Sequence, residues 1–132
     1  MGIERAVWEW LKSCPVGPGL PLEAEFLPVG RGLALQVVEP AHVTRRFILG
    51  GQEGRVRFAI VYRLSPSSSE ERLEAGETLE RLGRWAAQPE NWPGELRLRR
   101  VEPGGAALKE RRPDGTEDWE IMLTLEYEGQ AE

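Results

Sequence analysis

The sequence is poor in the residues on which most catalytic and metal sites depend. Its 132 residues include one cysteine, Cys14, and one histidine, His42. A single cysteine excludes an internal disulfide framework and favours a reducing compartment, and it leaves carboxylates as the main further metal ligands. A Cys14–His42 catalytic pair is one possibility; a buried structural Cys14 with a surface His42 is the other. We expect no catalytic residue, no metal, no cofactor and no enzymatic activity.

The chain also lacks a long apolar run and an excess of basic residues. No segment reaches the length of a signal sequence or a membrane span, so we expect no membrane partner. With 22 acidic and 17 basic residues the formal net charge is −5, which argues against a protein whose main task is to hold duplex DNA by its phosphates. Neither Gly50-Gly51 nor Gly17-Pro18-Gly19 is followed by the Gly-Lys-Ser/Thr of a phosphate loop.

The length is that of one domain, which we place at residues 1–132. A first helix ends at Pro15, because Ile3, Val7, Trp10, Leu11 and Cys14 follow helical spacing up to it. A proline- and glycine-rich connector then runs to Pro21.

A second helix is predicted from Ser69 to about Ala87. Either Ser67 with Glu70 or Ser68 with Glu71 has the spacing of a capping box. Gly76 lies inside this helix, where we expect it to allow a close approach to a sheet. The residues that can share its apolar side are Leu73, Leu79, Leu82, Trp85 and Ala86.

Alternating apolar residues bounded by turn residues predict several short strands. The clearest hairpin signal is the glycine-rich turn Gly50–Gly54 between two of them. The expected strands are 22–26, 33–38, 43–49, 55–64, 95–101, 106–112 and 118–128. The resulting order, α-β-β-β-β-α-β-β-β, predicts an α+β fold in which a mainly antiparallel β-sheet packs against two α-helices on one face.

Arginine is the dominant basic residue, since only Lys12 and Lys109 of the 17 basic residues are lysine. Several arginines share one face of a predicted strand, opposite its apolar residues. One interpretation is a solvated face on which arginines pair across strands with glutamates, Glu128 among them; the other is an interface between subunits. The loop around Trp92 is either a further contact surface or a cap on the core. The candidate interface residues are Arg55, Arg57, Arg63, Glu120, Glu126 and Trp92.

The densest group of carboxylates is Asp114, Glu117 and Asp118. Asp114 falls in a Pro-Asp-Gly turn, and turn geometry alone explains an aspartate there. The three lack the regular spacing of a calcium loop, so whether they bind a cation stays open.

The passage Arg45-Arg46-Phe47-Ile48-Leu49-Gly50-Gly51 and its continuation to Phe58 resemble a passage typical of small phage minor capsid or tail proteins. In that family a basic and aromatic strand runs into a glycine hairpin and out through alternating apolar residues. Further matches in the same order are Leu11 to Pro15, the helix end Leu82-Gly83-Arg84-Trp85, and the closing strand Trp119 to Tyr127.

The resemblance to tail terminator, or tail-completion, proteins implies a structural role in a phage or prophage. It implies a hexameric ring that caps the tail tube, with the major tail protein and the head–tail connector as partners and with transient contact to passing DNA. The implied location is the virion neck or tail, and the bacterial host cytoplasm during assembly. We hypothesise that Arg55, Arg57 and Arg63 pair partly with glutamates of a neighbouring copy.

Two other functions stay open. The first is a different neck component, such as a head-closure or adaptor protein. The second is a small ligand-binding regulatory domain, which would be a monomer with a pocket between the sheet and the helices.

Overall fold

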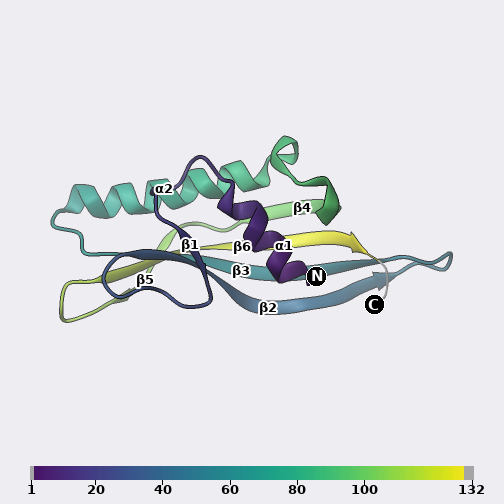
Figure 1. Cartoon of the computed structure of the whole chain (residues 1–132), viewed down its shortest axis with the longest axis horizontal. Coiled ribbons are helices and arrows are strands. Elements are labelled where there is room, and N and C mark those ends of the chain that lie inside the picture. The colour runs from purple at the N-terminus through teal and green to yellow at the C-terminus, as the bar shows by residue number, and fades with distance from the viewer. Residues whose placement is uncertain (1, 130–132) are drawn as a thin grey trace.

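The computed structural model confirms the α+β class and describes residues 2–129; residue 1 and residues 130–132 of the predicted domain lie outside them. Within the described residues, two α-helices and a six-stranded, mostly antiparallel sheet form the body of the fold (Figure 1). Two single-turn helices, η1 (Pro89–Asn91) and η2 (Gly94–Leu96), follow the second helix. The other elements are α1 (Ile3–Lys12), β1 (Leu22–Ala24), β2 (Gly32–Arg46), β3 (Gln52–Leu64), α2 (Ser69–Ala87), β4 (Leu98–Pro103), β5 (Ala107–Arg111) and β6 (Glu117–Gly129).

The sheet has the strand order β1-β2-β3-β6-β4, and β5 pairs with the N-terminal part of β6. All pairings are antiparallel except that of β1 with β2, which is parallel. The long central ladder between β3 and β6 runs without a break from Gln52 opposite Gly129 to Leu64 opposite Glu117. This ladder fixes which charged side chains face one another across the sheet.

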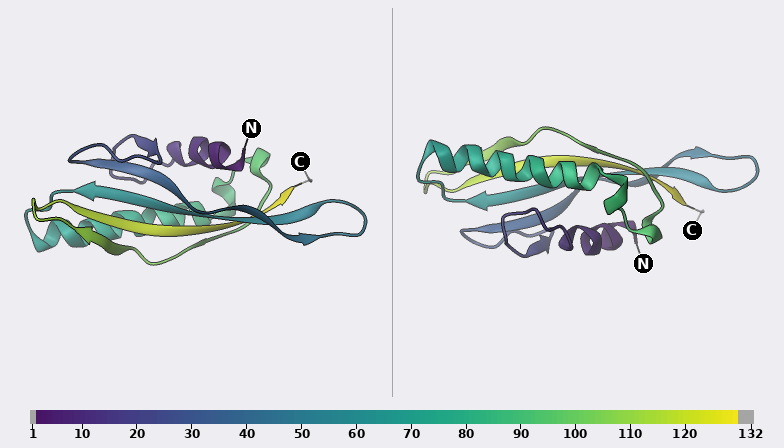
Figure 2. Two further views of the ribbon diagram at one scale, coloured as in Figure 1. Left: turned by 90° about the horizontal axis from the view of Figure 1, so that it is seen from below. Right: turned by 90° about the horizontal axis from the view of Figure 1, so that it is seen from above.

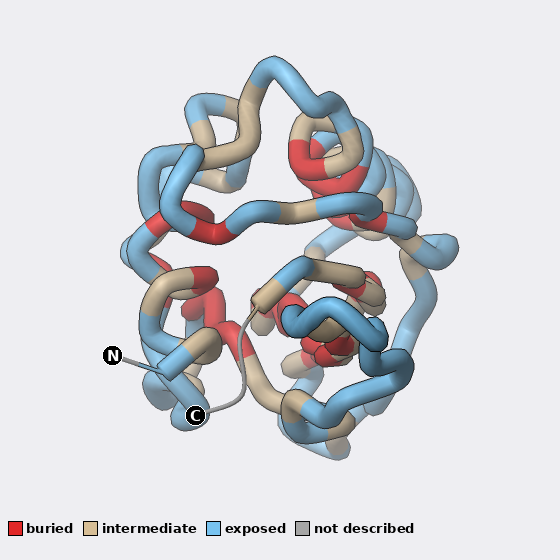
Figure 3. Tube along the Cα trace, turned by 90° about the vertical axis from the view of Figure 1, so that its right-hand side faces the viewer, coloured by how far each residue is buried: buried red, intermediate tan, exposed pale blue. Residues whose placement is uncertain are grey.

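Both helices contribute to one core cluster. Even-numbered residues of β3 such as Phe58 and Ile60 are fully buried, together with Val7 of α1 and Leu79 of α2. The rings of Trp10 and Trp85 stack 5.8 Å apart where the two helices meet. Figure 2 shows the helices running along the sheet, and Figure 3 shows the buried residues gathered inside the molecule.

The helix α2 begins as one of the two capping alternatives predicts. The backbone N–H of Glu71 donates to the Ser68 hydroxyl at 3.2 Å, and the Glu71 carboxylate accepts from the Ser67 backbone N–H at 2.6 Å. These bonds satisfy backbone donors that the first turn of a helix leaves open. The prediction for Leu73 is wrong, because its side chain is 67% exposed while Leu79 and Leu82 are buried.

Gly83, rather than Gly76, is the glycine that lets α2 approach the sheet. A Cβ added at Gly83 would lie 2.7 Å from Cδ1 of Ile121, whereas one at Gly76 would lie 3.7 Å from the nearest ring atom of Trp119. The first distance is a clash and the second is ordinary van der Waals contact. The expected role of Gly76 is therefore corrected.

The predicted strands 33–38 and 43–49 merge into one strand, β2, which ends at Arg46. Its pairing with β3 shifts register between Val37 and Glu39, between Glu39 and His42, and between Val43 and Arg45. The turn also lies earlier than predicted. Residues 47–51 form the loop of the β2–β3 hairpin, closed by the Phe47 N–H donating to the Gly51 carbonyl at 3.2 Å. Gly50 and Gly51 adopt positive φ angles of 94° and 83°, which glycine takes without strain. The hairpin extends beyond both helices (Figures 1 and 2).

Candidate interaction surfaces

The arginines predicted for an interface lie on the face of β3 opposite the helices. Arg55 is directly across from Glu126 of β6, and its Nη2 donates to Glu126 Oε1 at 3.3 Å. Arg57 lies 3.7 Å from the carboxylate of Glu39 on β2. Both charged groups are about two-fifths exposed, so these are surface ion pairs of small energy. The cross-strand pairing of Arg55 with Glu126 is thus observed.

In both arginines a terminal Nη atom has a carboxylate partner, but the Nε–H has none in the described part of the chain. Among the described residues, Nε of Arg55 and Nε of Arg57 are buried and have no hydrogen-bond acceptor. An unpaired buried donor costs free energy, which a ligand or partner oxygen would recover. The contact of these arginines with glutamates of a neighbouring copy stays a prediction.

Arg63 forms its hydrogen bonds within its own chain. Its guanidinium group donates to both carboxylate oxygens of Asp118, at 2.8 and 3.1 Å, and Arg112 donates to the same two oxygens at 3.1 and 2.7 Å. Burial alone would raise the pKa of Asp118, but the hydrogen bonds from Arg112 and Arg63 outweigh it and lower the pKa to about 2. Nη1 of Arg63 donates to the Pro28 carbonyl at 3.2 Å.

The neighbouring carboxylate, Glu117, is also held by two arginines. Nε of Arg72 and Nε of Arg111 donate to its Oε2 at 2.9 and 2.8 Å, and the indole N–H of Trp119 donates to its Oε1. Burial would raise the pKa of Glu117, yet these hydrogen bonds lower it. Asp114 accepts instead from the backbone and hydroxyl of Thr116. No group of residues in the described part of the chain has the composition of a metal site.

The last two candidates, Glu120 and Trp92, also have partners within the chain. Glu120 lies 3.7 Å from the Lys109 ammonium on β5. The indole N–H of Trp92 donates to the Ala86 carbonyl at 2.8 Å, and its ring packs against the core cluster. This is the position that a cap on the core would have.

The two residues considered for nucleophilic catalysis have separate surroundings. Cys14 lies just beyond α1 and packs against the core cluster, where burial raises the pKa of its thiol. His42 lies in the exposed part of β2, with Nδ1 near the Pro40 carbonyl and Nε2 3.4 Å from Glu39. Among residues 2–129, the Cys14 thiol and the His42 ring have no contact with each other, so the Cys14–His42 pair is not formed in this structure.

One surface that sequence reasoning missed is the tip of the β2–β3 hairpin, here defined as residues 45–51. Ile48 and Leu49 are fully exposed, at 103% and 99%, and Phe47 is partly exposed. Arg45 lies over the Phe47 ring, and Arg46 donates to the Gln52 side chain at 3.0 Å. Exposed apolar residues at the end of a projecting element commonly mark a contact with another molecule. The sequence placed these apolar residues in a strand, and that placement hid the signal.

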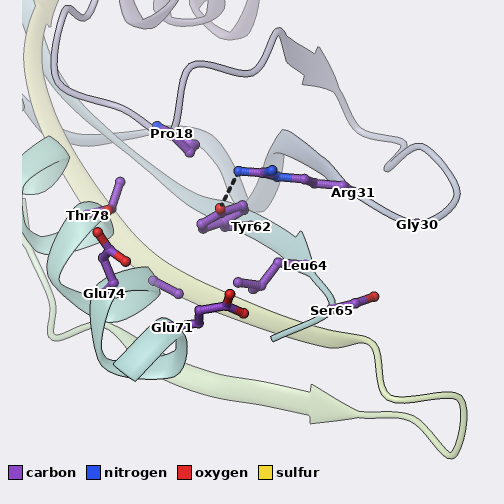
Figure 4. A pocket seen from close by; sticks show the side chains of 10 residues that line it. Pro18, Gly30, Arg31, Tyr62, Leu64, Ser65, Glu71, Glu74 and Thr78 are labelled. Atoms are coloured by element: carbon purple, nitrogen blue, oxygen red, sulfur yellow. Dashed lines mark hydrogen bonds between the residues drawn. The ribbon is translucent and has the colours of Figure 1, made fainter. Parts of the chain in front are cut away.

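A second surface is an open pocket of about 620 Å³ beside the first turns of α2, here called the α2 pocket (Figure 4). Arg31 donates to the Tyr62 hydroxyl at 3.3 Å on one side, and the carboxylates of Glu71 and Glu74 project from α2 on the other. Hydrogen bonding from Ser67 lowers the pKa of Glu71, so this carboxylate is ionised at neutral pH. The residues that line the pocket come from separate parts of the chain: Pro18, Gly30, Arg31, Tyr62, Leu64, Ser65, Glu71, Glu74, Ala75 and Thr78.

No family model and no curated protein matches the chain. One solved structure is similar over 98% of this chain and 92% of its own, at 20% identity and a TM-score of 0.44, and the name it carries states no function. Within residues 2–129, no helix is both long and apolar enough to cross a membrane.

Proposed function

We propose that this chain is a structural assembly protein that works as a ring of identical subunits, as phage tail terminators do. The single observation that carries this proposal is the projecting hairpin tip, on which Ile48 and Leu49 are fully exposed. Leaving two large apolar side chains in water gives up the free energy of their burial, about 1.5–3 kcal/mol for each, unless a partner covers them. Assembly supplies such a partner.

The finer role rests on the resemblance in sequence to tail terminator proteins. In that role the ring caps the finished tail tube, binds the major tail protein on one side and the head–tail connector on the other, and allows DNA to pass. A formal net charge of −5 suits this last task, because an acidic ring does not hold the DNA phosphates. The protein then belongs to the virion neck or tail and assembles in the bacterial host cytoplasm.

A small ligand-binding domain is the second candidate function, and the α2 pocket favours it. The pocket has the volume of typical small-molecule sites and brings together one arginine, one tyrosine hydroxyl and two carboxylates. This candidate differs from the first in one measurable property, since it requires no oligomer.

The test is electron microscopy of the purified protein combined with native mass spectrometry, alone and with tail tubes formed by the major tail protein of the same genome. The proposal predicts rings that attach to one end of the tube. Rings that do not bind the tube would favour a head-closure or adaptor protein. A strict monomer that leaves the tubes bare would contradict ring assembly and favour the ligand-binding domain.

A further inference from the structure

Large exposed apolar side chains lie at two opposite ends of the molecule. One group is the hairpin tip with Ile48 and Leu49; the other comprises Val29 and Leu73, which are 99% and 67% exposed. Phe26, which is 83% exposed, lies between them beside the middle of β2. The tip and Val29 lie at opposite ends of the β2–β3 ladder: Arg46 pairs with Gln52 at one end, and at the other Arg63 pairs with Gly32 and donates to the carbonyl of Pro28, the residue before Val29. Figure 1 shows the hairpin at one end of the long axis and the start of α2 at the other.

Unpaired charges of opposite sign accompany the two groups. Among the described residues, Arg45 and Arg46 at the tip form no ion pair. At the other end Glu70, Glu74 and Glu77 of α2 likewise form none within the described part of the chain, and neither does Arg31 on the opposite side of the α2 pocket; three carboxylates against this one guanidinium group leave that end acidic. A basic, apolar projection at one end is therefore complementary to an acidic, apolar surface at the other.

The α2 pocket gives this acidic end a concave shape. Tyr62, Leu64 and Ala75, each less than a tenth exposed, form its base, and the Glu71 and Glu74 carboxylates stand at its edge (Figure 4). A volume of about 620 Å³ lies within the range of pockets that enclose compact ligands. The tip of the same chain cannot reach this pocket, because the whole length of a paired β-ladder separates them.

We propose that the hairpin tip of one copy docks into the α2 pocket of a second copy, so that subunits join head to tail. In this contact Ile48 and Leu49 enter the pocket, and Arg45 and Arg46 face Glu74 and Glu70. Two different surfaces make a heterologous interface, which closes into a ring when the rotation between subunits divides a full turn. The inference rests on the proposed ring assembly and names the contact that builds it.

The experiment mixes two variants, each with one surface intact. The tip variant carries Ile48→Asp and Leu49→Asp; the pocket variant carries Glu74→Arg and Thr78→Arg. We expect each variant alone to associate at least tenfold more weakly than the wild type in sedimentation equilibrium. An equimolar mixture should form heterodimers and nothing larger, because only one intact tip and one intact pocket remain.

Circular dichroism checks that both variants fold, and Arg100→Glu, an exposed charge reversal on β4, should leave the oligomer unchanged. Arg57→Glu tests the alternative contact through the sheet face. If the tip variant forms the same oligomer as the wild type, the head-to-tail contact is wrong while ring assembly stands. The same holds if only Arg57→Glu dissociates the oligomer. The absence of heterodimers from the mixture also overturns it. A monomeric wild type overturns both proposals.

Discussion

The guanidinium group of Arg63 on β3 forms two parallel hydrogen bonds with the carboxylate of Asp118 on β6, at 2.8 and 3.1 Å. Asp118 is 4% exposed and receives a second bidentate contact from Arg112. Two positive charges therefore enclose one buried negative charge where β3 ends and β6 begins. Among the described residues, only these two arginines neutralise the buried charge of Asp118, so removing any one of the three groups should destabilise the fold.

Asp118→Asn should lower the free energy of unfolding by about 2 kcal/mol. The amide keeps the size of the carboxylate but leaves Arg63 and Arg112 without an opposite charge. Urea denaturation followed by circular dichroism measures the change. Glu102→Gln removes an exposed carboxylate that pairs with Arg100 and should change stability by less than about 0.5 kcal/mol. Equal effects of the two substitutions would contradict the role of the cluster.

The same carboxylate predicts how stability depends on pH. The pKa of Asp118 is about 2 in the folded protein and about 3.9 in an unfolded chain, so the unfolded state binds the proton more readily. The stabilisation is fully present above about pH 4 and is lost as the pH falls towards 2. Unfolding measured from pH 7 to pH 2 should show wild type and Asp118→Asn converging in this window. A constant difference between them down to pH 2 would count against the assignment.

Gly83→Ala and Gly76→Ala should have opposite effects. A methyl group at Gly83 meets Cδ1 of Ile121 at 2.7 Å, and overpacking of this kind costs about 1–3 kcal/mol. At Gly76 the nearest atom is 3.7 Å away, so alanine should stabilise the helix by up to about 1 kcal/mol. Thermal unfolding of both variants decides the matter. Stabilisation by alanine at Gly83 would show that α2 does not pack as closely as described.

Ser68→Ala should lower stability by about 1 kcal/mol, because it removes the hydroxyl that accepts from the Glu71 backbone N–H. Ser69→Ala is the matched control, one residue further along. No hydrogen bond from the Ser69 side chain is present among the described residues. If the two variants unfold at the same urea concentration, the cap is not at Ser68.

Local sequence signals predicted much of the fold, and α2 shows why. Its bounds follow from spacing within a few residues of chain, which the sequence displays directly, and the same spacing limits the capping residue to Ser67 or Ser68, of which the structure shows Ser68. The strand β2 shows the limit. The expected strands end at residue 38 and resume at residue 43, but only residues 33–35 of β2 pair with β1, so the segment around Pro40 lies at an edge of the sheet, where the missing N–H of proline costs little. Edge position is a property of the whole sheet and cannot be read from neighbouring residues.

The candidate surfaces divide in the same way. Alternation placed Arg55 and Glu126 on one face, and their pairing follows once the β3–β6 register is known. The ion pair between Arg63 and Asp118 could not be predicted in the same way, because the residue opposite Arg63 is known only from the register in which β3 and β6 pair. A pocket between the sheet and the helices is one of the alternatives that the sequence leaves open, but the residues that line the α2 pocket cannot be predicted, because they come from the connector, the residues before β2, the end of β3 and α2, which only the tertiary fold brings together. The sequence predicts the β2–β3 turn at Gly50–Gly54, three residues later than the observed loop at residues 47–51, and so assigns the exposed Ile48 and Leu49 to a strand.

Sedimentation equilibrium of the wild-type protein across a wide concentration range tests the proposed assembly most directly. Head-to-tail assembly requires a single closed oligomer whose mass is a multiple of 14.9 kDa and which dissociates on dilution. It also predicts that added salt weakens the association, because charges of opposite sign meet at the contact. A mass that stays at 14.9 kDa at every concentration would contradict it.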